Sequence, residues 1–255
     1  MIRGLYTAAS GMLVTQRQNE MISENIDNLQ NPGYREAEAS VEAFGPMLIE
    51  RIGGANGNAS EAVPIGAMGT GARADRIAIK NAPGLMRHTD EATDLAMASP
   101  GFFVVQTAQG ERYTRDGHFH LDPQGRLVTF GGQPVLGENG TIGPLSAEFK
   151  VSTEGTVTDQ GRTVDQLRVV NFQPGSLQRE GKTTLYALAP GGVAATPVAR
   201  ADVQVSQGTL EESNVNLNSQ MVKMITVMRA YEANQKVIQT QDATLEKAVN
   251  EVGKV

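Results

Sequence analysis

The sequence contains no cysteine and no tryptophan, and aromatic residues make up only 5% of its 255 residues. The absence of cysteine excludes disulfides, thiolate zinc sites and cysteine nucleophiles together. It also suits a protein that leaves the cytoplasm without acquiring disulfides. The shortage of large side chains limits the size of any single core, although this length allows one large domain or two modest ones.

Long runs of basic or apolar residues are also missing. The net charge is −6, with 22 Lys and Arg against 28 Asp and Glu, so we expect no nucleic-acid partner. No apolar stretch approaches the roughly 18–20 residues of a membrane span, so we expect no membrane insertion. The opening stretch, MIRGLYTAASGMLVTQ, is too polar for a cleaved signal peptide and continues as a helical pattern.

What the sequence does contain is a helical period at each end. Near the N-terminus, residues at alternating spacings of four and three form a heptad-like stripe that includes Leu5, Met12, Ile22, Ile26 and Leu29. Proline cannot continue a helix and glycine permits positive φ, so the Pro-Gly pair at 32–33 predicts a helix end near residue 29 or 30.

The C-terminal stripe is stronger, since neither proline nor glycine interrupts residues 209–252. Its apolar members are Leu217, Met221, Met224, Met228, Tyr231, Ile238 and Leu245. A single amphipathic helix is marginal in water, and one intramolecular pair would leave part of each stripe exposed. We therefore interpret both stripes as an assembly interface, completed by copies or relatives of the chain. The alternative is a simple antiparallel helical hairpin with a β insertion.

Between the two ends the period changes. Short strand-like runs such as GFFVVQT, LRVVNF and TTLYALA are separated by turns such as DPQG and PGG. The predicted fold class is α+β, a discontinuous helical domain of N- and C-terminal coiled-coil helices with an inserted all-β domain. The predicted parts are an N-terminal helix at 1–35, an irregular connector at 36–75, the all-β domain at 76–205 and a C-terminal helix at 206–255.

Reactive side chains give only weak signals. His118 and His120 share one face of a predicted strand, with Asp116 or Asp122 as further ligands for a metal, but a solvated strand face explains them better. The carboxylates at 90, 91 and 94 could form a glycosidase pair, yet a solvated loop is the commoner arrangement. GTGARAD lacks the residues of a phosphate loop. We expect no catalytic, metal or cofactor site, no cofactor, no small-molecule substrate and no enzyme activity.

Four ordered motifs resemble the bacterial flagellar axial proteins, specifically the rod proteins of the hook–basal body. The first helix ends in NIDNLQNPGY, similar to the family signature A-N-x-x-T-P-G-[YF] through Asn28, Pro32, Gly33 and Tyr34. Asp27 and Asn31 depart from that signature. TDLAMASPGFFVVQT, YTRDGHFHLDPQGRLVTFGGQPVLG and LEESNVNLNSQMVKMITVMRAYEANQKVIQTQDATLEKA are similar to the other three motifs.

The resemblance implies a structural subunit of the flagellar basal-body rod that polymerises helically into a drive shaft around the export channel. Its partners would be copies of itself, other rod and hook proteins and the flagellar export apparatus. It would be exported to the basal body without cleavage. The C-terminal motif favours a distal-rod type, and the length also allows a proximal-rod relative. Alternatives are a hook-type or adaptor axial protein, or a cell-wall-binding or hydrolysing β module. The matched junction residues, Asn28, Pro32, Gly33 and Tyr34, join the expected assembly interface.

Overall fold

The computed structural model describes residues 2–51, 63–173, 175–181 and 183–252. Two α-helices stand at its ends, α1 (Ile2–Asp27) and α2 (Leu217–Lys247), and α2 continues into the π-helical turn η2 (Ala248–Val252). The chain divides into two compact units. Unit 1 comprises residues 1–23, 38–78 and 218–255, and unit 2 comprises residues 24–37 and 79–217.

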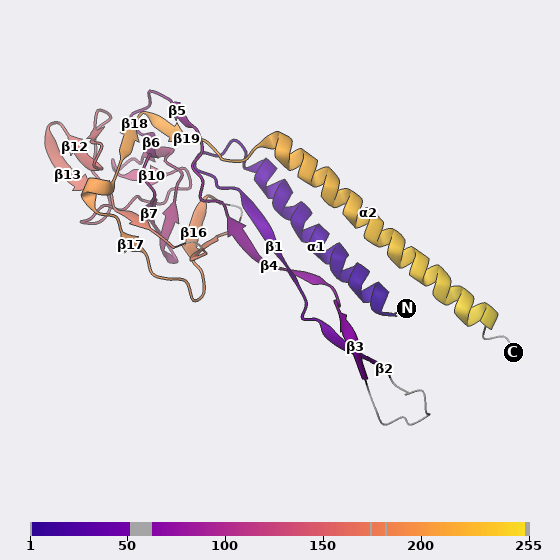
Figure 1. Cartoon of the computed structure of the whole chain (residues 1–255). Helices are drawn as coiled ribbons and strands as arrows, with labels where there is room; N and C mark the ends of the chain where they lie inside the picture. Colours follow the sequence, from indigo (N-terminus) through magenta and orange to yellow (C-terminus); the bar gives the residue numbers. More distant parts are fainter. Residues whose placement is uncertain (1, 52–62, 174, 182, 253–255) are drawn as a thin grey trace. The chain divides into compact units, whose positions relative to one another are not determined.

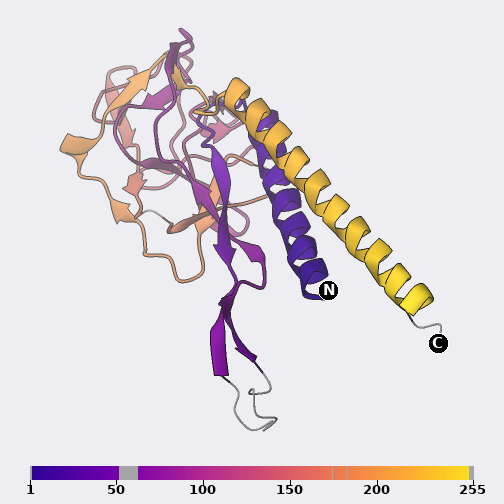
Figure 2. The same ribbon diagram turned by 45° about the vertical axis from the view of Figure 1, so that its right-hand side comes forward.

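Unit 1 combines the two helices with four strands. They are β1 (Ala37–Ala43), β2 (Met47–Arg51), β3 (Val63–Met68) and β4 (Ala72–Ile79). β1 pairs with β4, and β2 pairs antiparallel with β3 from Met47↔Met68 to Arg51↔Val63. Side chains join the strands to the helices, since Lys223 of α2 forms an ion pair with Glu38 of β1. Figures 1 and 2 both show α1 and α2 side by side in this unit.

Unit 2 is built from short strands. A six-stranded sheet has the order β15-β16-β8-β7-β14-β17, and smaller ladders pair β9 with β10, β11 with β12 and β13, β6 with β18, and β5 with β19. The last two ladders join the first strands of the unit to its last. The bounds are β5 (Met86–His88), β6 (Leu95–Met97), β7 (Phe102–Thr107), β8 (Gly110–Thr114), β9 (Phe119–Leu121), β10 (Leu127–Thr129), β11 (Lys150–Val151), β12 (Thr156–Asp159), β13 (Arg162–Gln166), β14 (Val169–Asn171), β15 (Leu177–Arg179), β16 (Leu185–Leu188), β17 (Thr196–Pro197), η1 (Arg200–Asp202), β18 (Val205–Gln207) and β19 (Thr209–Glu211).

The core of unit 2 lies on both faces of β7. Phe103 and Val105 belong to one buried cluster, with Phe119, Leu127 and other apolar side chains. Phe102 and Val104 point to the opposite face and pack in a second cluster with Tyr186. Side chains alternate between the faces of a strand, so the run FFVV supplies two cores at once.

The predicted fold class, a helical domain of terminal coiled-coil helices with an inserted all-β domain, is wrong. Strands predominate in the described residues, which contain only the two terminal α-helices. Unit 1 is not helical alone, because β1–β4 lie in it. Strands form by backbone pairing, which the Gly- and Ala-rich composition of residues 36–75 permits without an apolar period. Among the described residues, neither helix combines the length and apolar character that a membrane crossing requires.

Candidate assembly surface

Along α2, apolar side chains face solvent. Val222 is 65% exposed, and Ile225, Met221 and Met228 are each about half exposed, at 51–52%. The helix forms here because 31 residues pass without proline or glycine. A soluble surface usually scatters single apolar residues. A run of four within two turns of one helix therefore marks a candidate contact surface.

The contact between α1 and α2 is polar and close. A Cβ atom at Gly4 would lie 3.3 Å from Gln241 Nε2, and one at Gly11 would lie 2.9 Å from Asn234 Nδ2. The helices are antiparallel, because the residue number rises in one helix as it falls in the other. Glycines have no side chain, which lets helices approach closely. The amide side chains of Gln241 and Asn234 lie over these glycines, at positions where a coiled coil would place apolar residues.

This packing determines which face of α2 is covered. The least exposed positions of the helix are Gln220, Lys223, Met224, Val227, Asn234, Ile238, Gln241 and Leu245. Met224, Ile238 and Leu245 belong to the predicted apolar stripe, whereas Gln220, Lys223 and Val227 each lie one position before a member of it. Met221, Met228 and Tyr231 are therefore left outside the α1–α2 contact.

A groove also occurs in unit 1. Its cavity volume is about 590 Å³, and its lining comes from α1, the β2–β3 hairpin and α2. Lining residues include Gly4, Tyr6, Met47, Met68 and Val237. The hairpin is itself apolar and exposed, with Met47 at 56%. Exposed apolar residues thus occur on strands as well as on both helices of this unit.

The junction that follows α1 belongs to unit 2, and Asn25 organises it. Asn25 Nδ2 donates to the Ala37 carbonyl at 2.8 Å, and its Oδ1 accepts from Ala37 N at 3.0 Å. Tyr34 Oη also donates to Asn25 Oδ1 at 3.0 Å. Tyr34 is fully buried, and burial raises the pKa of its hydroxyl. The guanidinium of Arg179 lies 4.9 Å from the centre of the Tyr34 ring, a cation–π contact.

The turn itself depends on two further asparagines and one glycine. Asn28 Nδ2 donates to the Glu24 carbonyl at 2.7 Å, and Asn31 Nδ2 donates to Asn28 Oδ1 at 2.7 Å. Gly33 has φ +66°, a left-handed conformation that favours glycine. The family signature drew attention to Asn28 and Tyr34. It did not include Asn25, whose spacing of nine residues from Tyr34 is not a helical contact.

The residues expected to form the assembly interface fall into three groups. Exposed ones are Leu217, Met221, Met228 and Tyr231; half-buried ones are Leu5, Met12, Ile26, Leu29, Pro32, Met224, Ile238 and Leu245; buried ones are Ile22, Asn28, Gly33 and Tyr34. The exposed group is available for contact with another chain. The buried junction residues hold the chain's own turn, so any part they play in assembly is indirect.

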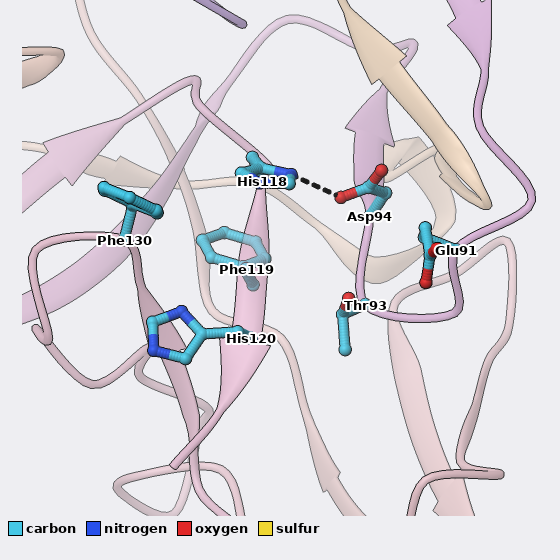
Figure 3. Close-up of a pocket in the computed structure, with 7 residues that line it drawn as sticks. All are labelled: Glu91, Thr93, Asp94, His118, Phe119, His120 and Phe130. Carbon is cyan, nitrogen blue, oxygen red and sulfur yellow. Dashed lines mark hydrogen bonds and ion pairs between the residues drawn. The ribbon is translucent and has the colours of Figure 1, made fainter.

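The other candidate chemistry falls at a pocket in unit 2, shown in Figure 3. Its volume is about 430 Å³, and its lining includes Glu91, Asp94, His118, His120 and Phe130. His118 Nδ1 lies 2.8 Å from Asp94 Oδ1, whereas the figure shows His120 turned away from that pair. Within the described parts of the chain, no three His, Cys, Asp or Glu side chains are placed to hold a metal ion.

The acidic residues once considered as a pair are separated by their partners. Asp90 lies 2.9 Å from His88 Nε2, and the Asp94 carboxylate is turned to His118. Asp122 is bound by Arg126, whose hydrogen bonds lower the pKa of that carboxyl against the opposing effect of burial. Asp90, Asp94 and Asp122 therefore each have a cationic or imidazole partner, whereas Glu91 lines the pocket beside Asp94.

Comparison with known proteins places this architecture in a class. Residues 206–251 match the family model described as flagellar basal body rod FlgEFG protein C-terminal, and residues 96–159 match that of the flagellar hook protein FlgE/F/G D1 domain. The chain is 35% identical to the flagellar hook-basal body complex protein FlhO of Bacillus subtilis, with 100% of each chain covered.

Two further relatives agree. The flagellar basal-body rod protein FlgG of Buchnera aphidicola subsp. Schizaphis graminum is 34% identical, with 97% of this chain and 98% of the relative covered. The flagellar basal-body rod protein FlgF of Escherichia coli K12 is 32% identical, with 95% of each covered. The chain therefore belongs to the flagellar hook–basal body rod family, and it is a structural rod subunit of the flagellum. Assembly with copies of itself and with other flagellar axial proteins follows from that membership.

Proposed function

We propose that the chain polymerises helically into the rod through the exposed apolar residues of unit 1. The observation that carries this proposal is the stripe of Met221, Val222, Ile225 and Met228 on α2, which the chain's own α1 leaves uncovered. Predicted interface residues that are half-buried, such as Leu5 and Met12, add further contacts in the assembly.

The size of the surface indicates how many neighbours are needed. Fully burying a Val, Ile or Met side chain contributes about 1.5–3 kcal/mol, so covering the exposed parts of Met221, Val222, Ile225 and Met228 contributes roughly 3–7 kcal/mol in total. Association costs about 4–15 kcal/mol in lost translational and rotational freedom. Over most of that range one such contact does not offset the cost. Stable binding requires several neighbours at once, as in a filament.

The two apolar surfaces of unit 1 differ, since one is a ridge of methionines on α2 and the other is the groove beside Gly4 and Met47. A contact between different surfaces of identical copies is heterologous, and such contacts generate helical filaments when the rotation does not close. Met side chains adapt to unlike partners, which suits a subunit that also meets other axial proteins.

Export and the lack of an enzymatic role complete the proposal. The chain reaches the basal body through the flagellar export apparatus with its N-terminus intact, because that segment forms α1 of the assembling unit. The β strands of unit 2 serve a structural purpose, with no catalytic reaction. The cell-wall-hydrolysing alternative is the weaker one, since the Asp90 and Asp94 carboxylates are each engaged by a histidine.

The test uses the full chain with Met228→Lys, and Gln239→Lys as the matched control on an exposed polar position of α2. We expect Met228→Lys to abolish sedimenting polymer while the helical circular dichroism of the monomer is retained, and Gln239→Lys to polymerise. A strain lacking residues 210–255 should be non-motile and lack complete basal bodies. Normal swimming of that strain, or equal polymerisation of the two lysine variants, would contradict the proposal.

A further inference from the structure

A buried cluster of three charges lies in unit 2. Glu211 of β19 is held between two arginines, with Arg35 Nη2 donating to Oε1 at 2.8 Å and Arg115 Nε donating to Oε2 at 2.7 Å. The three side chains are 1–5% exposed. Gly84 N also donates to Glu211 Oε1 at 3.0 Å. Both oxygens of this carboxylate are therefore occupied by donors from three separate segments.

Other donors of the arginines reach backbone carbonyls, but the buried Nε of Arg35 has no hydrogen-bond partner among the described residues. Arg115 donates to the carbonyl oxygens of Met97, Ser99 and Gly101 at 2.6–3.0 Å, so it bridges β6 and the start of β7. Arg35 donates to the Asn81 carbonyl. Buried charges are tolerated where most of their donors are satisfied in this way. The cluster thus connects the junction after α1, the first strands of unit 2 and its last strand.

Hydrogen bonds of backbone N–H groups also connect the junction after α1 with the end of β19 and the segment that follows it. Gly33 N donates to the Glu211 carbonyl at 2.7 Å, and Glu36 N donates to Asn214 Oδ1 at 2.6 Å. Arg35 and Glu211 are 176 residues apart in the chain. The segment that leaves α1 is therefore bound directly to the segment that leads into α2.

The cluster has a net positive charge, because one carboxylate pairs with two guanidinium groups. Burial lowers the pKa of Arg35, and the Glu211 carboxylate opposes that effect. An unpaired buried charge is far more costly than an exposed one. Without the Glu211 carboxylate, two buried cations would remain beside each other with only backbone carbonyls as partners. In a chain that lacks residue 211, Gly33 N would also lose its acceptor, the Glu211 carbonyl.

We infer that Glu211, Arg35 and Arg115 form a clasp that Glu211 closes. Residues 28–37 become ordered only when β19, which carries Glu211, is in place. β19 is the last strand of the chain, so it is synthesised after all the other strands and before α2. The turn at Pro32–Gly33 consequently stays open in an incomplete chain and closes only when residue 211 arrives. The segment that leaves α1 and the segment that leads into α2 then become ordered together.

The test is hydrogen exchange on the full-length monomer carrying Glu211→Gln. We expect exchange to quicken at least tenfold in residues 28–37, 84–88 and 95–101 together, while β12–β13 keep their protection. The control is Glu111→Gln, which breaks an exposed ion pair with Arg168 in the same unit and should leave all these segments unchanged. A change confined to residues 209–212, or none, would overturn the inference.

A second variant covers the case in which Glu211→Gln does not fold. Arg35→Met leaves Glu211 paired with Arg115 and Gly84, so we expect residues 28–37 to exchange faster while the β5–β19 ladder stays protected. In the double variant with Glu211→Gln, removing one unpaired cation should restore protection relative to Glu211→Gln alone. If residues 28–37 keep full protection in Arg35→Met, the clasp does not exist. These measurements concern the monomer, so their failure leaves the assembly proposal standing.

Discussion

Replacing Gly33 by alanine tests the junction at its narrowest point. A Cβ atom there would lie 2.3 Å from the carbonyl carbon of Arg115 and 2.5 Å from Asp116 N. These are backbone atoms, so the added methyl group cannot be accommodated by turning a side chain away. Either the turn or the chain at Arg115 must move, and the Gly33 N–H bond to Glu211 would be lost with it.

The expected decrease in the free energy of unfolding of Gly33→Ala is the sum of three costs. A left-handed conformation costs a non-glycine residue about 1–2 kcal/mol, overpacking costs about 1–3 kcal/mol, and one hydrogen bond contributes about 0.5–1.5 kcal/mol. The sum, roughly 3–6 kcal/mol, is a large part of the free energy of unfolding of a typical domain, about 5–15 kcal/mol. With a urea m-value of about 2 kcal/mol/M, the midpoint should fall by about 1–3 M.

The assay is urea unfolding followed by near-ultraviolet circular dichroism, which reports on unit 2 through Tyr34, Tyr113 and Tyr186. The control is Gly161→Ala in the β12–β13 turn, where φ is +79° but no atom lies within 4 Å of an added Cβ. The free energy of unfolding of the control should fall by only about 1–2 kcal/mol, the cost of the left-handed conformation. Equal losses in the two variants would refute the close-approach argument.

Two other predictions concern separate parts of the molecule. Burial raises the pKa of Asp116 despite hydrogen bonds from the His118 amide and Thr184, so its contribution to stability is present at low pH and is lost as the pH rises through that raised value. Asp116→Asn should therefore raise the urea midpoint at pH 7, with a gain that shrinks on acidification; a constant or negative difference would contradict this. In unit 1, Gly11→Leu should push α1 from α2 and lower the hydrogen-exchange protection of α1. Asn234→Ala in the same chain should restore part of it, and no restoration would show that the amide is not the obstacle.

The sequence predicted the two terminal helices and the turn between α1 and the strands, because these depend on local chemistry. Thirty-one residues without proline or glycine form α2, and the Pro32–Gly33 pair requires a turn with positive φ. The two-faced core of β7 follows from the run FFVV in the same way. The rod family was also identifiable at this level, since its motifs are short and contiguous.

Which face of α2 would be covered could not be predicted, because the covered face overlaps the apolar stripe only in part, at Met224, Ile238 and Leu245. The contact follows Gly4 and Gly11, which let amides approach, and this leaves Met221 and Met228 exposed. The strands within residues 36–75 were missed for a related reason. Their pairing uses backbone groups and leaves no period in the side chains.

The partners of Glu211 depended on the tertiary structure alone. In the sequence, Glu211 is one of two adjacent acids before a helix, where the positive helix end explains it well enough. The fold instead buries it between Arg35 and Arg115, 176 and 96 residues away. Local propensity carries no information about such distances. What the sequence determined by itself is therefore the helices, the turn and the family. Only the tertiary structure decided which apolar face stays open and which charges meet, because both depend on segments brought together from opposite ends of the chain.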